Sequence, residues 1–306
     1  MIRHLLRASY HHFVKPRFVR YRLATAGAAL HLDFYGEGIG FFAQLAAILQ
    51  FFRHAEAPGF QPVVSLTSLN YLDSDMGDDW FEYYFERRLP AVTASASQGL
   101  RIGNIKELPE FERDLSLAEA NALFDKYVRI KPDITGAVDQ FCRAHAIGPG
   151  IVGVHYRGTD KVGEAALVAY DAVFSAIGAV LAGRPGARGL FVTSDEQAFI
   201  GRIAARFPEL DIVTLNDSRR SDDGQPVHLG QRAPGNYALG RDALMNSLVL
   251  SRCGAVVRST SFLSAWASIF NPALPVVLLN TPYDHKLWFP EREIMKGAVL
   301  ARNLTT

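Results

Sequence analysis

Five short apolar segments in the second half of the chain constrain its fold more than any other feature of the sequence. They are residues 151–155, 189–193, 211–215, 255–258 and 275–279. The intervening sequence contains helical patterns, at 169–181, 196–206, 242–251 and 262–270. Strands that are apolar throughout and alternate with helices are typical of a parallel sheet covered on both faces. The pattern therefore predicts an α/β, doubly wound, Rossmann-like domain.

The first half of the chain is less regular, and we expect a second domain there. Its patterns predict strands at 28–33 and 62–66 and helices at 41–53, 117–128 and 133–146. Ser116, with Glu119 three residues later, is typical of a helix N-terminus. A chain of 306 residues is long enough for two domains. The turn-forming sequence Gly148-Pro149-Gly150 predicts the boundary: an N-terminal domain at 1–148 and a C-terminal domain at 149–306, whose tail can pack back on the first.

The composition is that of an ordinary soluble globular protein. About half of the residues are apolar and the formal net charge is +1, which argues against a surface built for nucleic acid. Two cysteines, Cys142 and Cys253, are too few for a disulfide framework or a cysteine zinc site. No apolar run reaches the roughly 20 residues that span a bilayer, and the charged N-terminus does not read as a signal peptide. We therefore expect a cytoplasmic protein without a bound metal.

The N-terminal arm, residues 1–22, is basic and carries no acidic residue. Aromatic residues lie between its charges. They are Tyr10, Phe13, Phe18 and Tyr21. One interpretation is an anionic partner such as a membrane surface, which would make the protein peripheral to the membrane. We favour the plainer alternative, in which the arm docks on its own domain through these aromatics and leaves its charges in solvent.

The segment Gly153-Val-His-Tyr-Arg-Gly-Thr-Asp-Lys161 places chemistry directly after a buried strand. Ligands of a doubly wound sheet bind at the carboxyl ends of its strands. Arg157 can hold a diphosphate through two parallel hydrogen bonds, and Lys161 adds a second positive charge. Gly158 allows a close backbone approach, and Asp160 can orient either cation. The alternative is a salt-bridge cluster at a strand end.

This segment resembles the first motif of the α-1,6- and protein O-fucosyltransferases, which include the nodulation fucosyltransferases. His155, Arg157, Thr159, Asp160 and Lys161 match it. Phe191–Glu196 is similar to the family's second motif and Arg258–Phe262 to its third, so the resemblance covers roughly residues 151–280. It implies a GT-B fold with two Rossmann-like domains, a nucleotide-sugar donor in the C-terminal one, and inverting chemistry without a metal or other cofactor.

The resemblance also implies roles for individual residues. Arg157 would bind the β-phosphate of GDP-fucose, and His155 would lie near the nucleoside with Asp195, beside which Glu196 stands. Thr260, Ser261 and the amide of Phe262 would bind phosphate at a helix N-terminus, where free N–H groups favour an anion. The acceptor would be a glycan, glycolipid or protein hydroxyl.

A general base for the acceptor hydroxyl is expected from the glycine-rich loop Tyr35-Gly-Glu-Gly-Ile-Gly40. Its Glu37 resembles the glutamate found in one branch of the O-fucosyltransferases. A helix-start carboxylate favoured by the helix dipole is the alternative.

One residue departs from the family pattern. Asn246 stands where the family commonly has a guanine-recognising aspartate, and Asp242, four residues earlier on the same helix face, can substitute for it. Two alternatives therefore stay open: a transferase that uses another nucleotide sugar, and a catalytically silent nucleotide-sugar-binding protein.

Overall fold

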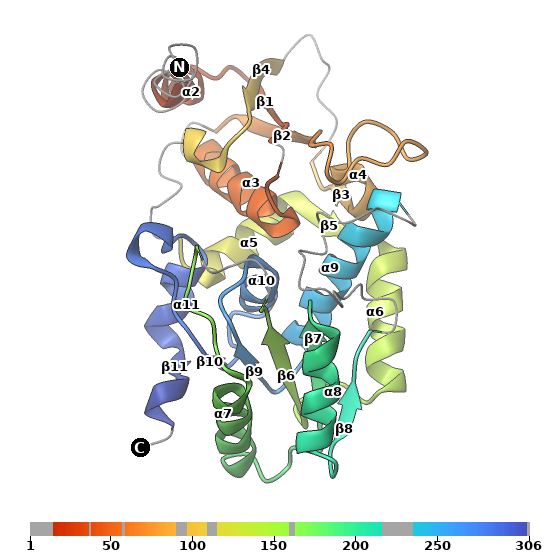
Figure 1. Cartoon of the computed structure of the whole chain (residues 1–306). Helices are drawn as coiled ribbons and strands as arrows, with labels where there is room; N and C mark the ends of the chain where they lie inside the picture. The colour runs from red at the N-terminus through yellow and green to blue at the C-terminus, as the bar shows by residue number, and fades with distance from the viewer. Residues whose placement is uncertain are drawn as a thin grey trace, which may run out of the picture. The chain divides into compact units, whose positions relative to one another are not determined.

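The computed structural model describes residues 15–36, 38–56, 59–89, 97–108, 115–158, 163–215 and 235–304 (Figure 1). Internal contacts divide the chain into two compact units. Unit 1 comprises residues 1–113, 122–131 and 235–237, and unit 2 comprises residues 114–121, 132–234 and 238–306. The chain passes between the units more than once, so residues 132–148, which the sequence analysis assigned to the N-terminal domain, group with unit 2. The assignment of acceptor and donor to separate domains stays a prediction.

Unit 2 contains a six-stranded sheet in which every pair of neighbours is parallel. Its strands are β6 (Ile151–Tyr156), β7 (Gly189–Ser194), β8 (Asp211–Val213), β9 (Ala255–Arg258), β10 (Val276–Leu278) and β11 (Val299–Leu300). The spatial order is β11-β10-β9-β6-β7-β8. Counted from β6 as the first strand, this is the 3-2-1-4-5-6 order of dinucleotide-binding sheets. The doubly wound sheet predicted from the five apolar segments is confirmed.

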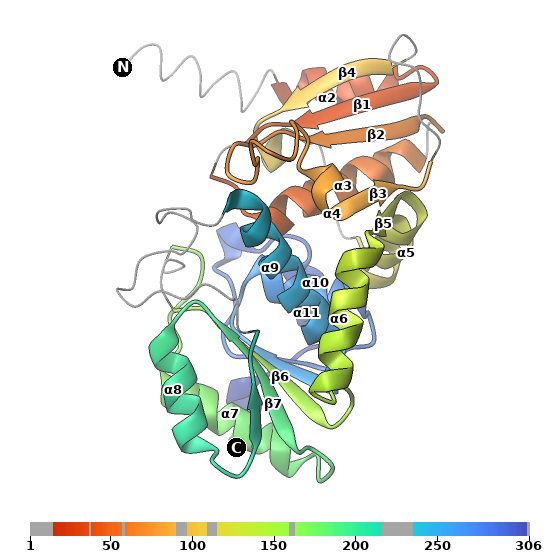
Figure 2. The same ribbon diagram turned by 90° about the vertical axis from the view of Figure 1, so that its right-hand side faces the viewer.

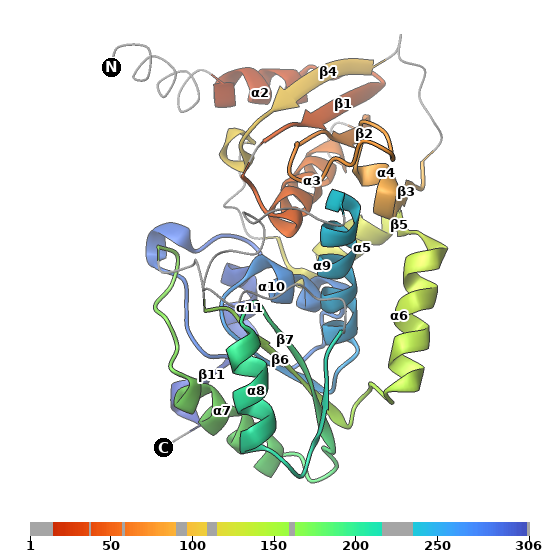
Figure 3. The ribbon, with the colours of Figure 1, turned by 45° about the vertical axis from the view of Figure 1, so that its right-hand side comes forward.

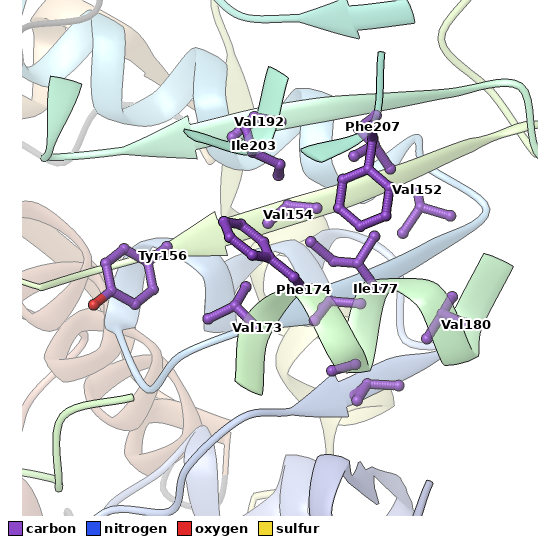
Figure 4. Close-up of a cluster of buried hydrophobic side chains, with 14 of the residues drawn as sticks. Val152, Val154, Tyr156, Val173, Phe174, Ile177, Val180, Val192, Ile203 and Phe207 are labelled. Carbon is purple, nitrogen blue, oxygen red and sulfur yellow. The ribbon is translucent and has the colours of Figure 1, made fainter. Parts of the chain in front are cut away.

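Helices cover both faces of this sheet (Figure 2). They are α6 (Pro132–Ala144), α7 (Tyr170–Ala182), α8 (Gln197–Arg206), α9 (Gly235–Ser251), α10 (Phe262–Phe270) and α11 (Glu291–Gly297). Side chains alternate along a strand, and in β6 Val152, Val154 and Tyr156 pack against α7 and α8 (Figure 4). Gly153 and His155 face the other side, where α9 and α10 lie. This alternation gives β6 two buried faces and makes it apolar almost throughout.

The C-terminal segment completes unit 2. After η5 (Asp284–Lys286) and α11, the short strand β11 joins the sheet edge beside β10, and η6 (Ala301–Asn303) follows. Ile294 of α11 packs with Ala265 of α10 and Leu278 of β10. The tail therefore packs on the C-terminal sheet.

Unit 1 is built on a small parallel sheet in the order β2-β1-β4 (Figure 3). Its elements are α2 (Lys15–Ala24), β1 (Ala29–Phe34), α3 (Phe41–Glu56), β2 (Gln61–Leu66), α4 (Phe81–Tyr84), β3 (Phe85–Arg87), β4 (Ser97–Ile102), η3 (Ile105–Glu107) and β5 (Val128–Ile130), which pairs antiparallel with β3. Helix α3 is buried along nearly its whole length, because its own side chains are apolar on almost every side. The predicted strands at 28–33 and 62–66 correspond to β1 and β2, whereas β4 was not predicted because Gly99 and Arg101 interrupt its apolar pattern.

Helix α5 (Leu117–Tyr127) begins as its sequence predicts. The Glu119 N–H donates to Ser116 Oγ at 3.2 Å, and the Ser116 N–H donates to Glu119 Oε2 at 3.0 Å. These two bonds form the capping box expected from the spacing. Among the described helices, none is long and apolar enough to cross a membrane.

Candidate functional site

The candidate site lies at the carboxyl ends of β6, β7 and β9. Strands β6 and β9 are neighbours in the sheet, yet the chain leaves β6 toward β7 on one side and reaches β9 only after β8. This is the point where the strand order reverses, and ligands of doubly wound sheets bind there. Three segments of the sequence motifs thus reach one edge of the sheet: Arg157–Gly158, Asp195–Glu196 and Ser259–Phe262.

His155, the fifth residue of β6, belongs to a buried polar network. Its Nδ1 lies 3.1 Å from the Oγ of Ser264 in α10. Ser264 Oγ in turn accepts a hydrogen bond of 2.7 Å from Nε of Arg258, the residue that faces His155 across the sheet. Burial, together with the nearby Arg258 and Arg157 guanidinium groups, lowers the pKa of His155 from 6.5 to about 3. His155 is therefore neutral near pH 7 and offers polar contacts rather than a charge.

Arg157 follows β6 and is held through both its backbone and its side chain. Its N–H donates to Ser259 Oγ at 2.9 Å, which ties the end of β6 to the end of β9. Its guanidinium Nε lies 3.9 Å from Asp195 Oδ2, and the side chain is 22% exposed. The cation is thus partly buried at the sheet edge and still reachable by a ligand. This environment suits a group that binds an anion.

Asp195 and Glu196 both turn back toward the segment that follows β6. Asp195 Oδ1 accepts the Gly158 N–H at 3.2 Å. The Tyr170 hydroxyl donates to Glu196 Oε2. A Cβ at Gly158 would lie 2.0 Å from Glu196 Oε1 and 2.9 Å from the Tyr156 ring, so the close approach that Gly158 permits is to Glu196. Burial and this carboxylate both raise the pKa of Tyr170.

The start of α10 is partly occupied by the chain itself. The Thr260 N–H donates to Asn280 Oδ1 at 2.8 Å, and the Ser261 N–H donates to Glu291 Oε1 at 3.2 Å. Glu291 also forms a buried ion pair with Arg258. A helix N-terminus favours any anion that can reach it, and here the Glu291 carboxylate accepts the Ser261 N–H. Phosphate binding by Thr260, Ser261 and the Phe262 amide, which the resemblance implies, stays a prediction.

The Ser261 hydroxyl behaves differently from its amide. Ser261 is 4% exposed, and its Oγ has no hydrogen-bond partner among the described residues. Buried hydroxyl groups are normally hydrogen-bonded. A polar ligand atom at the N-terminus of α10, which begins at Phe262, would form a hydrogen bond with this hydroxyl group.

Asp242 and Asn246 share one face of α9, as their spacing predicted. Asn246 Nδ2 donates to Asp242 Oδ1 at 3.1 Å and to the Asp242 carbonyl oxygen at 3.0 Å. Asn246 is buried, whereas Asp242 is half-buried. The Asn246 amide thus orients the Asp242 carboxylate, which lies one helical turn before the position where the family has its aspartate.

Several residues named in the sequence analysis lie outside the described residues. They are Glu37, Thr159, Asp160 and Lys161. The neighbours of Glu37 are described: Gly36 and Gly38 follow the carboxyl end of β1, and the Gly38 N–H donates to Asn70 Oδ1 at 3.2 Å. Gly38 has φ of 72°, a left-handed conformation that favours glycine. Within the described part of the chain, no cluster of three or more His, Cys, Asp or Glu residues is arranged to hold a metal ion.

The partners of the polar residues beneath the site were not predicted from the sequence. Arg258 is completely buried, and its partner Glu291 lies 33 positions away. Asn280, which follows β10, accepts from Thr260 and donates through Nδ2 to the Ala166 carbonyl oxygen at 2.7 Å. An arginine inside an apolar strand does indicate a buried acidic partner. Nothing in the sequence identifies which acid it is.

The comparisons with known proteins agree with this geometry at the level of the fold. No family model and no curated protein matches the sequence. Among solved structures, the α-1,6-fucosyltransferase NodZ soaked with GDP-fucose aligns over 84% of this chain and 99% of its own, with a TM-score of 0.54 and 17% identity. This chain shares its fold with NodZ.

Two further structures show the same similarity. NodZ from Bradyrhizobium aligns over 84% of this chain and 99% of its own, with a TM-score of 0.54 and 16% identity. A mutant of FUT1 from Arabidopsis thaliana in complex with GDP aligns over 90% of this chain and 76% of its own, with a TM-score of 0.50 and 12% identity. The GT-B arrangement implied by the three motifs is therefore confirmed as the fold.

Proposed function

We propose that this chain is a glycosyltransferase that transfers fucose from GDP-fucose to an acceptor hydroxyl. The observation that carries the proposal is the position of Arg157: a partly exposed cation at the point where the strand order reverses, tied by its backbone to Ser259. A diphosphate is the ligand that such a site suits best. The fold shared with GDP-fucose-soaked NodZ supports the same donor.

The proposed donor site extends from Arg157 along the sheet edge. Arg157 binds the β-phosphate, and the buried Ser261 hydroxyl donates to a phosphate oxygen at the start of α10. His155 and Asp195 contribute near the nucleoside. Lys161 adds positive charge, and Thr159 and Asp160 complete the motif.

The proposed reaction is a single displacement that inverts the anomeric carbon. The acceptor oxygen forms a bond to that carbon as the bond to the β-phosphate oxygen breaks, and GDP departs with the electron pair. Arg157 stabilises the negative charge that develops on the leaving phosphate. Glu37 accepts the proton of the acceptor hydroxyl. This scheme uses no metal, and residues 1–148 supply the acceptor side for a glycan, glycolipid or protein.

The identity of the donor base depends on α9. A carboxylate can accept both N–H groups of a guanine edge, and Asp242 is held by the Asn246 amide on the same helix face. We propose that Asp242 recognises guanine. The alternative, a transferase for another nucleotide sugar, is favoured by Asn246 itself, because it is an amide at the position where the family commonly has a carboxylate.

The experiment that tests the donor class is calorimetric titration of the full chain with GDP, UDP, ADP and GDP-fucose, with EDTA present. Binding of GDP and GDP-fucose alone is expected. If only UDP or ADP binds, the donor is a nucleotide sugar with that base and GDP-fucose is ruled out. If none binds, the transferase proposal fails.

Turnover separates an enzyme from a silent binding protein. Glu37→Gln is expected to keep donor affinity and lose GDP release from GDP-fucose, because the amide cannot accept the proton. A collapse of donor affinity in this variant would instead make Glu37 part of the donor site. If the wild-type chain binds GDP-fucose but releases no GDP with any acceptor tested, the alternative of a catalytically silent binding protein is supported.

A further inference from the structure

Helix α2 is the described part of the basic N-terminal arm, and its inner face docks on unit 1. Val19 and Leu23, one turn apart, are 0% and 5% exposed. Lys15 on the same face forms an ion pair with Glu107 at 3.1 Å, with both side chains largely buried. The Arg22 side chain donates to the Gly99 carbonyl oxygen of β4 at 3.0 Å. This side of the helix is fully explained by the fold.

The outer side of α2 carries aromatic rings in solvent. Phe18 is 48% exposed and Tyr21 is 64% exposed. The sequence analysis favoured an arm that docks through its aromatics, and for these two residues that is wrong. The helix docks through Val19 and Leu23 instead, because those two positions lie one turn apart on a single face. Phe18 and Tyr21 therefore keep much of their surface in contact with solvent.

Arginines flank these exposed rings. Arg17 and Arg20 are exposed, and within the described part of the chain neither forms an ion pair. The Arg22 guanidinium carbon lies 6.0 Å from the centre of the Phe18 ring. Residues 1–22 contain no acidic residue, so nothing in the arm's own sequence neutralises this charge. We call Arg17, Phe18, Arg20 and Tyr21 the outer face of α2.

We propose that the outer face of α2 binds the surface of a lipid bilayer that contains anionic phospholipids. Basic side chains are attracted by the negative potential of such a surface. Phenylalanine and tyrosine rings insert favourably at the level of the headgroups. The rings distinguish a bilayer from a polyanion without an apolar layer, such as nucleic acid. The whole chain has a net charge of only +1, so it is not attracted to an anionic surface as a whole. The attraction would come from the basic residues of this face.

The contact would be peripheral and reversible. A ten-residue helix presents only a few side chains to the headgroups, and each basic residue near the surface contributes modestly. Salt weakens the attraction because the charges are exposed. The inference does not depend on the transferase activity, since none of the four residues belongs to the proposed donor site.

The test is co-sedimentation of the full chain with vesicles of phosphatidylcholine alone or mixed with phosphatidylglycerol. We expect binding to the mixed vesicles at low salt and much weaker binding to phosphatidylcholine alone. Arg17→Gln/Arg20→Gln should weaken partitioning into mixed vesicles roughly thirtyfold, the combined effect of two surface charges. Phe18→Ser/Tyr21→Ser should also weaken it.

Matched controls are available in unit 2. Arg202→Gln/Arg206→Gln removes two exposed arginines from α8, also a ten-residue helix. Leu167→Ser/Tyr283→Ser removes two apolar side chains that are 56% and 42% exposed. Both control variants should bind vesicles as the wild type does, and circular dichroism should show that all four variants are folded.

Three outcomes would overturn the proposal. The first is a wild-type chain that does not sediment with mixed vesicles. The second is equal vesicle binding by the outer-face variants and their controls. The third is binding to a short DNA duplex that matches binding to the mixed vesicles, which would indicate a general polyanion surface.

Discussion

At the scale of single residues, the proposed chemistry depends most on Arg157. Its guanidinium is expected to donate charge-assisted hydrogen bonds to the diphosphate, each worth roughly 1.5–3 kcal/mol. The loss of even one such bond weakens binding about 10- to 150-fold, so Arg157→Ala should weaken GDP binding at least that much in a calorimetric titration. The variant should still fold, because alanine keeps the backbone hydrogen bond from residue 157 to Ser259 Oγ, and urea unfolding checks this. Wild-type affinity in a folded Arg157→Ala protein would remove Arg157 from the donor site.

His155 gives a pH-dependent prediction. Its pKa is about 3 in the folded chain and 6.5 without the burial and the arginines. Below pH 6.5 the unfolded chain takes up a proton that the folded chain does not, so His155 makes stability fall as the pH falls. Between pH 6.5 and about pH 5 the loss should be roughly 1.5–2 kcal/mol.

Urea unfolding at several pH values measures this loss. His155→Gln should lose stability less steeply with acid than the wild type, because glutamine does not titrate. The exposed His145 serves as the control, and His145→Gln should follow the wild-type profile. Parallel profiles for wild type and His155→Gln would contradict the burial of a neutral histidine in this network.

At the scale of elements, Asn280 connects the end of β10 to the start of α10 and to the segment between β6 and α7. Its Oδ1 accepts from the Thr260 N–H before α10, and its Nδ2 donates to the Ala166 carbonyl oxygen in the segment after β6. Asn280→Asp keeps the acceptor and sets a carboxylate oxygen against the carbonyl oxygen. We expect a stability loss of roughly 1–3 kcal/mol. GDP binding should also weaken, because the segment between β6 and α7 loses one of the hydrogen bonds that hold it to the residues after β10.

Asn271 provides a matched control in the same unit. Its Nδ2 donates to the Ser251 carbonyl oxygen at 2.9 Å, and its Oδ1 accepts from the Ala273 N–H at 3.2 Å. Asn271→Asp should lower stability by a similar amount and leave GDP affinity unchanged. If Asn280→Asp binds GDP as tightly as Asn271→Asp does, Asn280 is a structural residue only.

At the scale of the whole molecule, the proposed donor residues of the described chain all belong to unit 2. GDP at about 100 times its Kd should stabilise the binding-competent fold by roughly 2.7 kcal/mol. Hydrogen exchange should then slow in peptides that cover the ends of β6, β7 and β9. Peptides from β1, β2 and β4 of unit 1 should exchange as they do without GDP. Protection confined to unit 1 would contradict a donor site at the β6–β9 edge.

The sequence by itself determined the main strands of unit 2, their parallel arrangement and the residues at their ends. Strands buried on both faces must be apolar throughout, so they appear as continuous runs in the sequence. The polar residues that follow such runs lie at the carboxyl edge of the sheet, as Arg157 does. Strands β3, β5 and β11 have two or three residues each and leave no such pattern.

Only the tertiary structure decided which polar groups meet beneath that edge and which face of α2 stays outside. Glu291 reaches the Ser261 amide and Arg258 because α11 packs beside α10 and β10, and a contact between positions so far apart leaves no local pattern. Phe18 and Tyr21 point outward because Val19 and Leu23 already fill the docked face. Periodicity assigns residues to faces, but the neighbouring elements decide which face is buried.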